Sequence, residues 1–353
     1  METLNAFYER LAFDLDDGNQ GHFLSGWQCE NSFSEDLLSA IRERASRIDH
    51  TKYSYFDDND DLPSMISALH TGFGESEPQT VLCGCGSSAL ISAFVTYLRR
   101  RGVRKVYYVP PLYFTFLTGL EGYGIEAQPV SGKQPYEGDC SLELPTTEGS
   151  VLLLSDPVWY AGTPLSADLL DVIADWQRTT RSLVFVDGSL QYLPWNGEIT
   201  ERTSLLDPSL TFRLICPSKQ LSIHGYRFAY LLLPASEERA LAWSYANTVG
   251  PAGADSIAFA YESISAIGHR NIPRKLMALA SGRYNSFITT GIITSSIVPS
   301  CGYFVFGRIT RPLPENYTVI DGSYFGQNNF SGYMKINLLS PSIHLIASES
   351  NCI

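Results

Sequence analysis

The middle of the chain alternates between short runs of β-branched or aliphatic residues and segments in which apolar residues recur at helical spacing. The predicted strands are 80–83, 106–109, 151–155, 183–187, 213–215 and 228–233, and the predicted helices between them are 89–101, 113–123 and 167–179. Fully buried strands read as nearly continuous apolar runs, and amphipathic helices between them cover the faces of a parallel sheet. The pattern therefore predicts an α/β fold with a mostly parallel central sheet and helices on both faces.

The last third of the chain has a different pattern. A long helical region over 236–279 precedes shorter predicted strands near 303–308 and 333–338. Long helices followed by short strands indicate a smaller α+β unit. We therefore expect three parts: an N-terminal segment over 1–45 that packs on the small domain, a large domain over 46–250, and a small C-terminal domain over 251–353.

Charge and composition exclude several classes of function. The chain has 25 Lys and Arg against 37 Asp and Glu, a formal net charge of −12, which disfavours nucleic acids and anionic membranes as partners. No apolar run reaches the roughly 18–20 residues of a membrane span, and the acidic start of the chain does not resemble a signal peptide. The seven cysteines and six histidines lack the paired spacing of a zinc site. We expect a cytoplasmic protein with reduced thiols and no metal.

The residues that follow the predicted strands carry the candidate chemistry, because ligands of α/β sheets lie at the carboxyl ends of the strands. Gly86, Ser87 and Ser88 follow the first strand and begin a helix, whose free N–H groups and dipole favour an anion. Asp187 ends a buried strand, where an unpartnered carboxylate is costly, so it should meet a cation or a donor. Lys219 follows the predicted strand over 213–215, and Arg227 comes eight residues after Lys219. Each motif alone is weak.

Taken together, these motifs resemble the fold-type I enzymes that use pyridoxal phosphate. The resemblance is to the class I/II aminotransferases, in particular the branch with histidinol-phosphate aminotransferase and threonine-phosphate decarboxylase. It covers roughly residues 30–345 and keeps the family's order: phosphate turn, ring-stacking aromatic, turn at the cofactor oxygen, strand-end Asp, Ser-Lys, and Arg eight residues beyond the lysine.

The resemblance implies a role for each matching residue. Lys219 would hold pyridoxal 5'-phosphate as a Schiff base and move the proton at the substrate carbon, while Asp187 would pair with the pyridine nitrogen. Tyr113 would stack on the ring. The phosphate and the rest of the cofactor would be held by Gly86, Ser87, Ser88, Ser218 and Arg227.

The family also implies a homodimer with shared active sites. A tyrosine from the neighbouring subunit would reach the phosphate, and Tyr55, or alternatively Tyr53, matches it. The expected substrate is a small molecule, an amino acid or amine.

Four positions depart from the family pattern. Trp159 stands where an Asn usually donates to the cofactor's phenolic oxygen, Leu190 where a Tyr is usual, and Cys216 where a Ser or Thr contacts the phosphate. Tyr160 is a candidate replacement for the missing donor. Lys335 stands where an Arg usually clamps the substrate carboxylate.

The residues expected to grip the cofactor, from the phosphate turn to Asp187, Lys219 and Arg227, are retained, whereas the substrate side is altered at Lys335. A lysine provides a point charge without the two parallel bonds of a guanidinium. Arg308 and Arg311 are alternative sources of the clamp.

Three functions remain open. The first is an aminotransferase of specialised metabolism. The second is a related reaction that begins in the same way: decarboxylation, elimination or cyclisation, as in the related capreomycidine-forming cyclases. The third is a sensor that binds the cofactor without catalysis. Such regulators carry an N-terminal DNA-binding domain, for which we expect the short acidic N-terminus to leave no room.

His224 lies between Lys219 and Arg227 and is interpreted as a turn or core histidine.

Overall fold

The structure is a computed structural model, and it describes residues 22–56, 58, 61–75, 80–199, 205–313, 316–325, 330 and 332–348. The large sheet has seven strands in the spatial order β2 (Thr80–Gly84), β8 (Ala229–Leu233), β7 (Thr211–Ile215), β6 (Leu183–Asp187), β5 (Val151–Ser155), β3 (Lys105–Tyr108) and β4 (Glu126–Pro129). The strands from β7 to β4 are parallel, whereas β8 is antiparallel to both of its neighbours. The predicted α/β fold with a mostly parallel sheet is confirmed.

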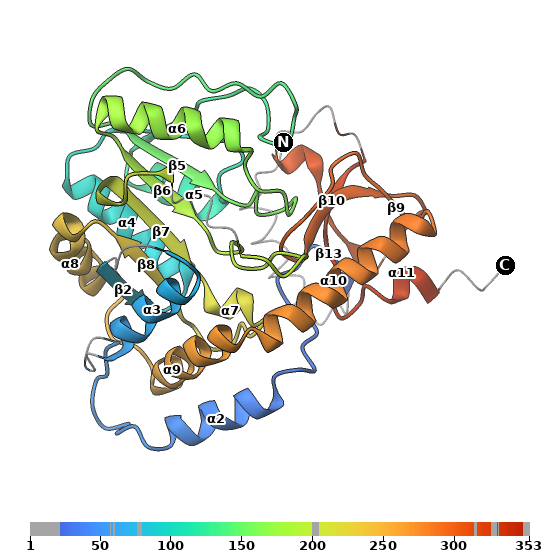
Figure 1. Cartoon of the computed structure of the whole chain (residues 1–353), viewed down its shortest axis with the longest axis horizontal. Coiled ribbons are helices and arrows are strands. Elements are labelled where there is room, and N and C mark those ends of the chain that lie inside the picture. Colours follow the sequence, from blue (N-terminus) through green and yellow to red (C-terminus); the bar gives the residue numbers. More distant parts are fainter. Residues whose placement is uncertain are drawn as a thin grey trace.

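Helices cover both faces of this sheet (Figure 1). Alternate residues of β5 point to opposite faces: Leu153 packs in a cluster with α4 (Ser87–Arg100) and α5 (Phe114–Gly122), whereas Leu152 and Leu154 pack with α6 (Ala167–Thr180). Every residue of β5 and β6 is buried, which is why both strands read as unbroken apolar runs. The sheet is therefore the middle layer of three.

The remaining helices pack around the large sheet or connect it to the smaller C-terminal unit. The element bounds are α2 (Glu35–Ala45), α3 (Asp61–Gly72), α7 (Pro217–Gln220), α8 (Glu238–Thr248), α9 (Ala254–His269), α10 (Asn271–Thr289) and α11 (Leu345–Ser348). Short 3₁₀ turns lie at Pro208–Leu210, Ala235–Glu237 and Gly322–Phe325. Helix α9 packs against α2, α3 and α10, and α10 runs diagonally toward the smaller sheet in Figure 1.

The smaller sheet has four antiparallel strands. Their spatial order is β12 (Ile320–Asp321), β13 (Met334–Asn337), β10 (Phe304–Ile309) and β9 (Ile293–Thr294). A separate pair joins the start of the described chain to this unit, since β1 (His22–Phe23) runs parallel to β11 (Tyr317–Thr318). This pairing carries the N-terminal segment across the small sheet and toward the ends of the large-sheet strands. The domain boundaries expected from the sequence stay predictions.

The helical region expected over 236–279 is present, and it consists of three helices, α8, α9 and α10, separated by two breaks. The first break contains Gly250 with a φ of +83° followed by Pro251, and the second is Arg270, which has a left-handed φ of +61°. The sequence also gave no sign of β4, an edge strand whose residues are mostly exposed and which ends in Pro129.

A buried ion-pair network anchors β7, the strand that leads to Lys219. Glu75 accepts hydrogen bonds from Arg213 of β7 at 2.8 Å and from the Tyr192 hydroxyl at 2.6 Å, and it lies 2.8 Å from His70 Nδ1. Burial alone would raise the pKa of Glu75, but the hydrogen bonds from His70 and Arg213 hold it well below its usual range. The network fixes the chain after α3 to the strands on which the candidate site is built.

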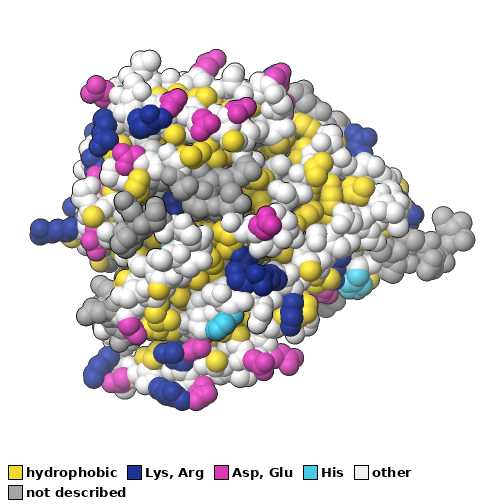
Figure 2. Space-filling view, viewed as in Figure 1, with side chains coloured by type: hydrophobic (Ala, Val, Ile, Leu, Met, Phe, Trp, Pro, Cys, Tyr) yellow, Lys and Arg dark blue, Asp and Glu magenta, His cyan; other side chains and the backbone are white. Residues whose placement is uncertain are grey.

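The surface is of mixed charge on the face seen in Figure 2, where acidic and basic side chains are interspersed and no large basic patch gathers. Within the described ranges, no helix has both the length and the apolar character needed to cross a membrane.

Candidate active site

The candidate site lies where β5, β6 and β7 end next to one another. Their register pairs Ser155 with Asp187 and Asp187 with Leu214, so Asp187 stands at the centre of this edge. The chain leaves β7 through Cys216 and enters the short helix α7, which carries Lys219. Parallel strands therefore bring a carboxylate and an amine, 32 positions apart in the sequence, to one edge of the sheet.

Lys219 is held in an apolar environment. Its Nζ lies 3.8 Å from the ring centroid of Trp27 and 5.4 Å from that of Tyr113. Burial lowers the pKa of Lys219, and the nearby charge of Asp187 partly opposes this shift. A lowered pKa increases the fraction of unprotonated amine, the form in which a lysine is a nucleophile.

Asp187 is 5% exposed and accepts one backbone hydrogen bond, from Ser189 N at 3.1 Å. An ionised carboxylate accepts up to about four hydrogen bonds. Asp187 therefore keeps capacity for a further donor at the strand end. This fits the protonated nitrogen of a pyridine ring, the partner that the sequence resemblance implies.

An anion cradle lies at the start of α4. Gly86 is its N-cap, with a φ of +87°, and a Cβ at this position would lie 2.7 Å from Arg227 Nη2. Ser87 and Ser88 form the first turn of the helix, which contains no acidic residue. Only glycine combines this left-handed backbone with such close approach of a guanidinium. Helix N–H groups and a cation converging on one place suit a phosphate.

Ser218 holds the loop that carries Arg227. Its side chain is 2% exposed, and its Oγ lies 3.0 Å from the carbonyl oxygens of both Tyr226 and Phe228. Arg227 Nη1 in turn donates to the carbonyl oxygen of His224 at 3.2 Å. Ser218 thus positions the arginine through the backbone, and its direct contact with a cofactor stays a prediction.

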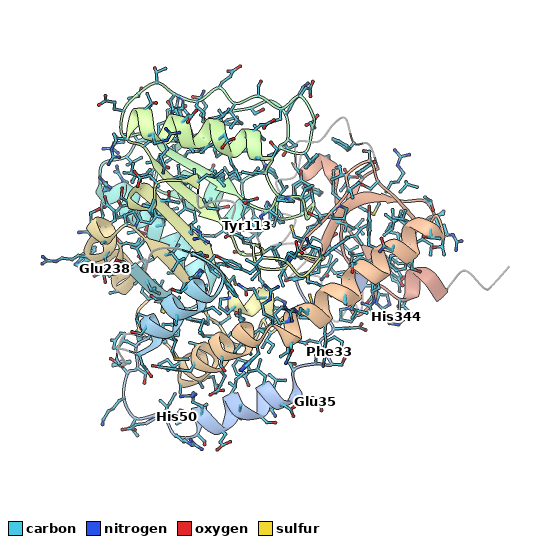
Figure 3. All side chains as sticks on the ribbon, in the orientation of Figure 1. Phe33, Glu35, His50, Tyr113, Glu238 and His344 are labelled. Carbon is cyan, nitrogen blue, oxygen red and sulfur yellow. The ribbon has the colours of Figure 1, made fainter. Side chains whose placement is uncertain are left out.

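Tyr113 is buried, and in the view of Figure 3 it lies between the large sheet and the small sheet. It is the N-cap residue of α5, and its ring meets Trp159 edge-on with centroids 5.3 Å apart. Burial raises the pKa of Tyr113, so its hydroxyl stays neutral. Its position beside Lys219 agrees with the expected stacking role, which itself stays a prediction.

Trp27 is a residue of this site that the sequence did not reveal. Its ring lies between two amines, 3.8 Å from Lys219 Nζ and 4.2 Å from Lys335 Nζ. Trp27 comes from the N-terminal segment, in a stretch without any motif, and reaches the site because β1 pairs with β11. Its only sequence signal was that tryptophan is rare in this chain, at 5 residues.

Lys335 is fully buried on β13, and its contacts within the described part of the chain are a carbonyl oxygen and aromatic rings. Its Nζ donates to the carbonyl oxygen of Ser25 at 2.9 Å and lies 3.9 Å from the ring centroid of Phe304. Burial lowers the pKa of Lys335 well below its usual range, and the charge on Lys219 lowers it further. Lys335 and Lys219 thus lie against the same Trp27 ring, with Lys335 enclosed by aromatic side chains, and the role of Lys335 in binding the substrate stays a prediction.

Most of the other candidate residues are exposed to solvent. Arg308 and Arg311 are exposed, and Tyr55 and Tyr53 are 41% and 81% exposed. An exposed Tyr55 is compatible with a contact to a second subunit, which stays a prediction. Burial lowers the pKa of His224 to about 4, and the charges of Lys219 and Arg227 add to this shift, so His224 is neutral at physiological pH.

Of the departures from the family pattern, Trp159 and Cys216 lie in the same buried cluster as Tyr113, whereas Leu190 packs in the cluster around the small sheet. Trp159, Leu190 and Cys216 are all buried. Tyr160 is also buried, and its hydroxyl lies 2.8 Å from the Tyr136 hydroxyl. Tyr160 is therefore engaged with another tyrosine, and its role as the replacement donor stays a prediction.

Cysteines and other possible metal ligands are dispersed. The described cysteines, all free thiols, are Cys29, Cys83, Cys85, Cys140, Cys216 and Cys301. Over the part of the chain that the structure describes, no three His, Cys, Asp or Glu side chains gather as a metal site would require.

Comparison of the chain with solved structures identifies proteins of the same architecture. Aspartate aminotransferase from Thermotoga maritima is 14% identical and superimposes with a TM-score of 0.78, covering 97% of this chain and 94% of that one. The chain has the aminotransferase fold. N-succinyldiaminopimelate aminotransferase from Mycobacterium tuberculosis is 17% identical, with a TM-score of 0.76 over 94% of this chain and 92% of that one. Substrate-bound BacF from Bacillus subtilis is 16% identical, with a TM-score of 0.79 over 96% and 92%.

Sequence comparison alone finds no such relatives: no protein-family profile and no curated protein sequence matches the chain. At these identities the similarity is one of fold. It confirms the fold-type I architecture that a few motifs in the right order predicted.

Proposed function

We propose that this aminotransferase-fold chain is a pyridoxal-phosphate-dependent enzyme, and specifically an aminotransferase that acts at the α-carbon of a small amino acid or amine in specialised metabolism. One observation carries the proposal. A partly buried lysine on α7 and a buried carboxylate at the end of β6 lie at one edge of the sheet, beside an anion cradle in which Arg227 lies against Gly86. Solved structures that are named aminotransferases share the whole fold.

The residues present fit the cofactor. The cradle of Gly86, Ser87, Ser88 and Arg227 would hold its phosphate, and Asp187 would accept a hydrogen bond from its ring nitrogen. Tyr113 would contact the ring face. Lys219 would provide the amine that binds the cofactor's aldehyde carbon.

The bound cofactor supplies an electron sink for the charge that develops at the substrate's α-carbon. The chain's own residues do the rest. Lys219 takes the proton from the α-carbon and returns it to a different atom, for which its lowered pKa is suited. Asp187 keeps the ring nitrogen protonated by offering a buried negative charge. Trp27 and Phe304 exclude water from the space around the two lysines.

The substrate side favours a small, largely apolar substrate with one carboxylate. Aromatic rings surround Lys335, and its Nζ has a single carbonyl partner, Ser25, among the residues that the structure describes. A substrate carboxylate would stabilise the charged ammonium and reverse the depression of its pKa. Lys335 is thus proposed to bind the carboxylate, and a homodimer with shared sites is proposed from the exposed Tyr55.

A second reaction is favoured by the same substitutions. Lys335 and Trp159 replace the residues that usually orient the substrate and the cofactor oxygen. A looser hold on the carboxylate would permit decarboxylation or an elimination–cyclisation of the same substrates. These reactions release carbon dioxide or a leaving group, whereas transamination needs a keto acid as acceptor.

The test is a panel of amino acids and amines with the purified, cofactor-loaded protein. A substrate is expected to change the visible spectrum, and transamination is expected to form more than one equivalent of keto acid per site only when a second keto acid is supplied. Release of carbon dioxide or of a β or γ substituent without an acceptor would instead identify the second reaction. A protein that shows no visible band with pyridoxal phosphate would contradict the proposal as a whole.

Lys335→Met is expected to raise KM for the amino-acid substrate by ~10–100-fold, because one charge-assisted hydrogen bond of about 1.5–3 kcal/mol is lost. Methionine keeps the length and apolar stem of the side chain, so the aromatic cage is retained. The visible band should be unchanged because Lys335 is not proposed to bind the cofactor. Steady-state kinetics measure the effect, and Arg308→Ala and Arg311→Ala are the controls. An unchanged KM for Lys335→Met with a large rise for either arginine variant would remove Lys335 from the site.

A further inference from the structure

Trp159 carries a buried hydrogen-bond donor. The residue is 4% exposed, and its indole Nε1 has no hydrogen-bond partner among the residues that the structure describes. An indole N–H can donate but cannot accept. Buried donors in folded proteins are nearly always paired, and an exception points to a ligand that binds there or to another functional role. We therefore expect a bound ligand to supply the acceptor for the indole N–H of Trp159.

The surroundings of Trp159 are those of the candidate cofactor site. Its ring meets Tyr113 edge-on at 5.3 Å, stacks near Trp27 at 6.0 Å, and lies 5.1 Å from Lys335 Nζ. It is carried by the turn after β5, the strand whose last residue, Ser155, pairs with Asp187. The unpaired donor thus lies among the residues proposed to bind the cofactor ring and the substrate.

The chemistry of the cofactor leaves one acceptor unassigned. Its phosphate fits the cradle of Gly86 and Arg227, and its ring nitrogen fits Asp187. The remaining acceptor is the phenolic oxygen, which is negatively charged and adjacent to the carbon that Lys219 binds. We propose that Trp159 Nε1–H donates a hydrogen bond to this phenolic oxygen. The inference rests on the proposed function and assigns a positioning residue within it.

Tyr160 is the natural alternative, and its contacts argue against it. Its hydroxyl is 2.8 Å from the Tyr136 hydroxyl, and its ring stacks on Phe325 with centroids 4.0 Å apart. Tyr160 is therefore satisfied within an aromatic cluster. The neighbouring Trp159 is not. This contrast makes Tyr160→Phe a matched control, since it removes one hydroxyl from the same turn.

The bond has a spectroscopic consequence. A donor to the phenolic oxygen stabilises its negative charge and weakens its hold on the proton of the nitrogen that joins Lys219 to the cofactor. The yellow form then loses this proton at a lower pH. Removing the donor should raise the pKa of the yellow form by about 1–2 pH units, the range expected for one hydrogen bond to a charged group.

The experiment is a spectrophotometric pH titration of cofactor-loaded wild type, Trp159→Phe and Tyr160→Phe. Phenylalanine keeps an aromatic ring while removing the indole N–H. We expect a raised pKa for Trp159→Phe and a wild-type pKa for Tyr160→Phe. Equal pKa values for Trp159→Phe and wild type, or a rise confined to Tyr160→Phe, overturn the inference while leaving the proposed function intact. A wild type without a yellow form refutes the proposed function and the inference with it.

A second measurement, NMR of the indole N–H groups, uses the wild-type protein and does not depend on whether a Trp159 variant folds. The chain has five tryptophans, so ¹⁵N-labelled protein gives few indole N–H signals. Trp176 and Trp195 already donate to backbone carbonyl oxygens at 2.6 Å, and their signals should move little. We expect the Trp159 signal to move downfield when pyridoxal phosphate binds to the apoprotein. A signal that stays in place on saturation overturns the inference.

Discussion

Lys219→Ala is expected to abolish turnover, with a loss of at least ~10⁴-fold in kcat, because one side chain is proposed both to hold the cofactor and to move the substrate proton. General acid–base catalysis alone contributes about 10²–10⁴-fold, and loss of the covalent attachment adds to this. The cradle of Gly86 and Arg227 is untouched by the substitution. The variant should therefore still bind pyridoxal phosphate, but without the yellow band that requires the bond to Lys219.

Borohydride reduction of the wild type tests the same assignment independently. Reduction fixes the cofactor to the amine that carries it, and peptide mass spectrometry locates the adduct. We expect it on Lys219. Lys275→Ala serves as the control, since Lys275 is exposed on α10 and should leave the band and the kinetics unchanged. An adduct on any other lysine would show that the site has been assigned to the wrong residue.

The fold was predictable because buried parallel strands leave a clear signal. β5 and β6 are buried at every position, so Val151–Ser155 and Leu183–Asp187 stand out as apolar runs that end in a polar residue. The edge strand β4 faces solvent and carries no such pattern. The helical region after residue 236 kept its apolar spacing across Gly250 and Arg270, so the breaks at these positions were not recognised.

The site was predictable only where its residues follow strands. Asp187 and Lys219 were found because the ends of parallel strands meet at one edge of a sheet. Trp27 belongs to a segment whose position depends on the pairing of β1 with β11, which no local pattern encodes. The burial of Lys335 was missed for a similar reason, since Trp27 and Phe304 close around it only in the folded chain.

Trp159 shows how a sequence departure and a structural irregularity support each other. The sequence identified an unusual residue at a position where a donor is expected. The structure adds that its indole N–H is buried and has no acceptor among the described residues, whereas the hydroxyl of the adjacent Tyr160 lies 2.8 Å from that of Tyr136. Neither observation alone tells whether the usual hydrogen-bond donor to the phenolic oxygen has been lost or has been replaced by another donor. Together they favour replacement of an amide donor by an indole donor.

Asp187→Asn is expected to slow turnover by ~10³-fold, equivalent to about 4 kcal/mol of activation free energy. The amide keeps the size of the side chain and an oxygen that accepts the Ser189 N–H bond, so the strand end should be preserved. It removes the buried negative charge that keeps the ring nitrogen protonated, and a neutral ring is a poorer electron sink. Cofactor affinity should fall much less, because the contacts of Gly86 and Arg227 with the phosphate remain.

Steady-state kinetics and a cofactor titration measure these two quantities separately. Asp187→Glu is the matched variant that restores the charge, and it should recover part of the lost rate because its carboxylate is displaced by one methylene. Loss of cofactor binding in Asp187→Asn would indicate a structural role at the strand end. If Asp187→Asn kept near-normal turnover, its carboxylate would not face the ring nitrogen. The proposed orientation of the cofactor between β6 and the cradle would then be wrong.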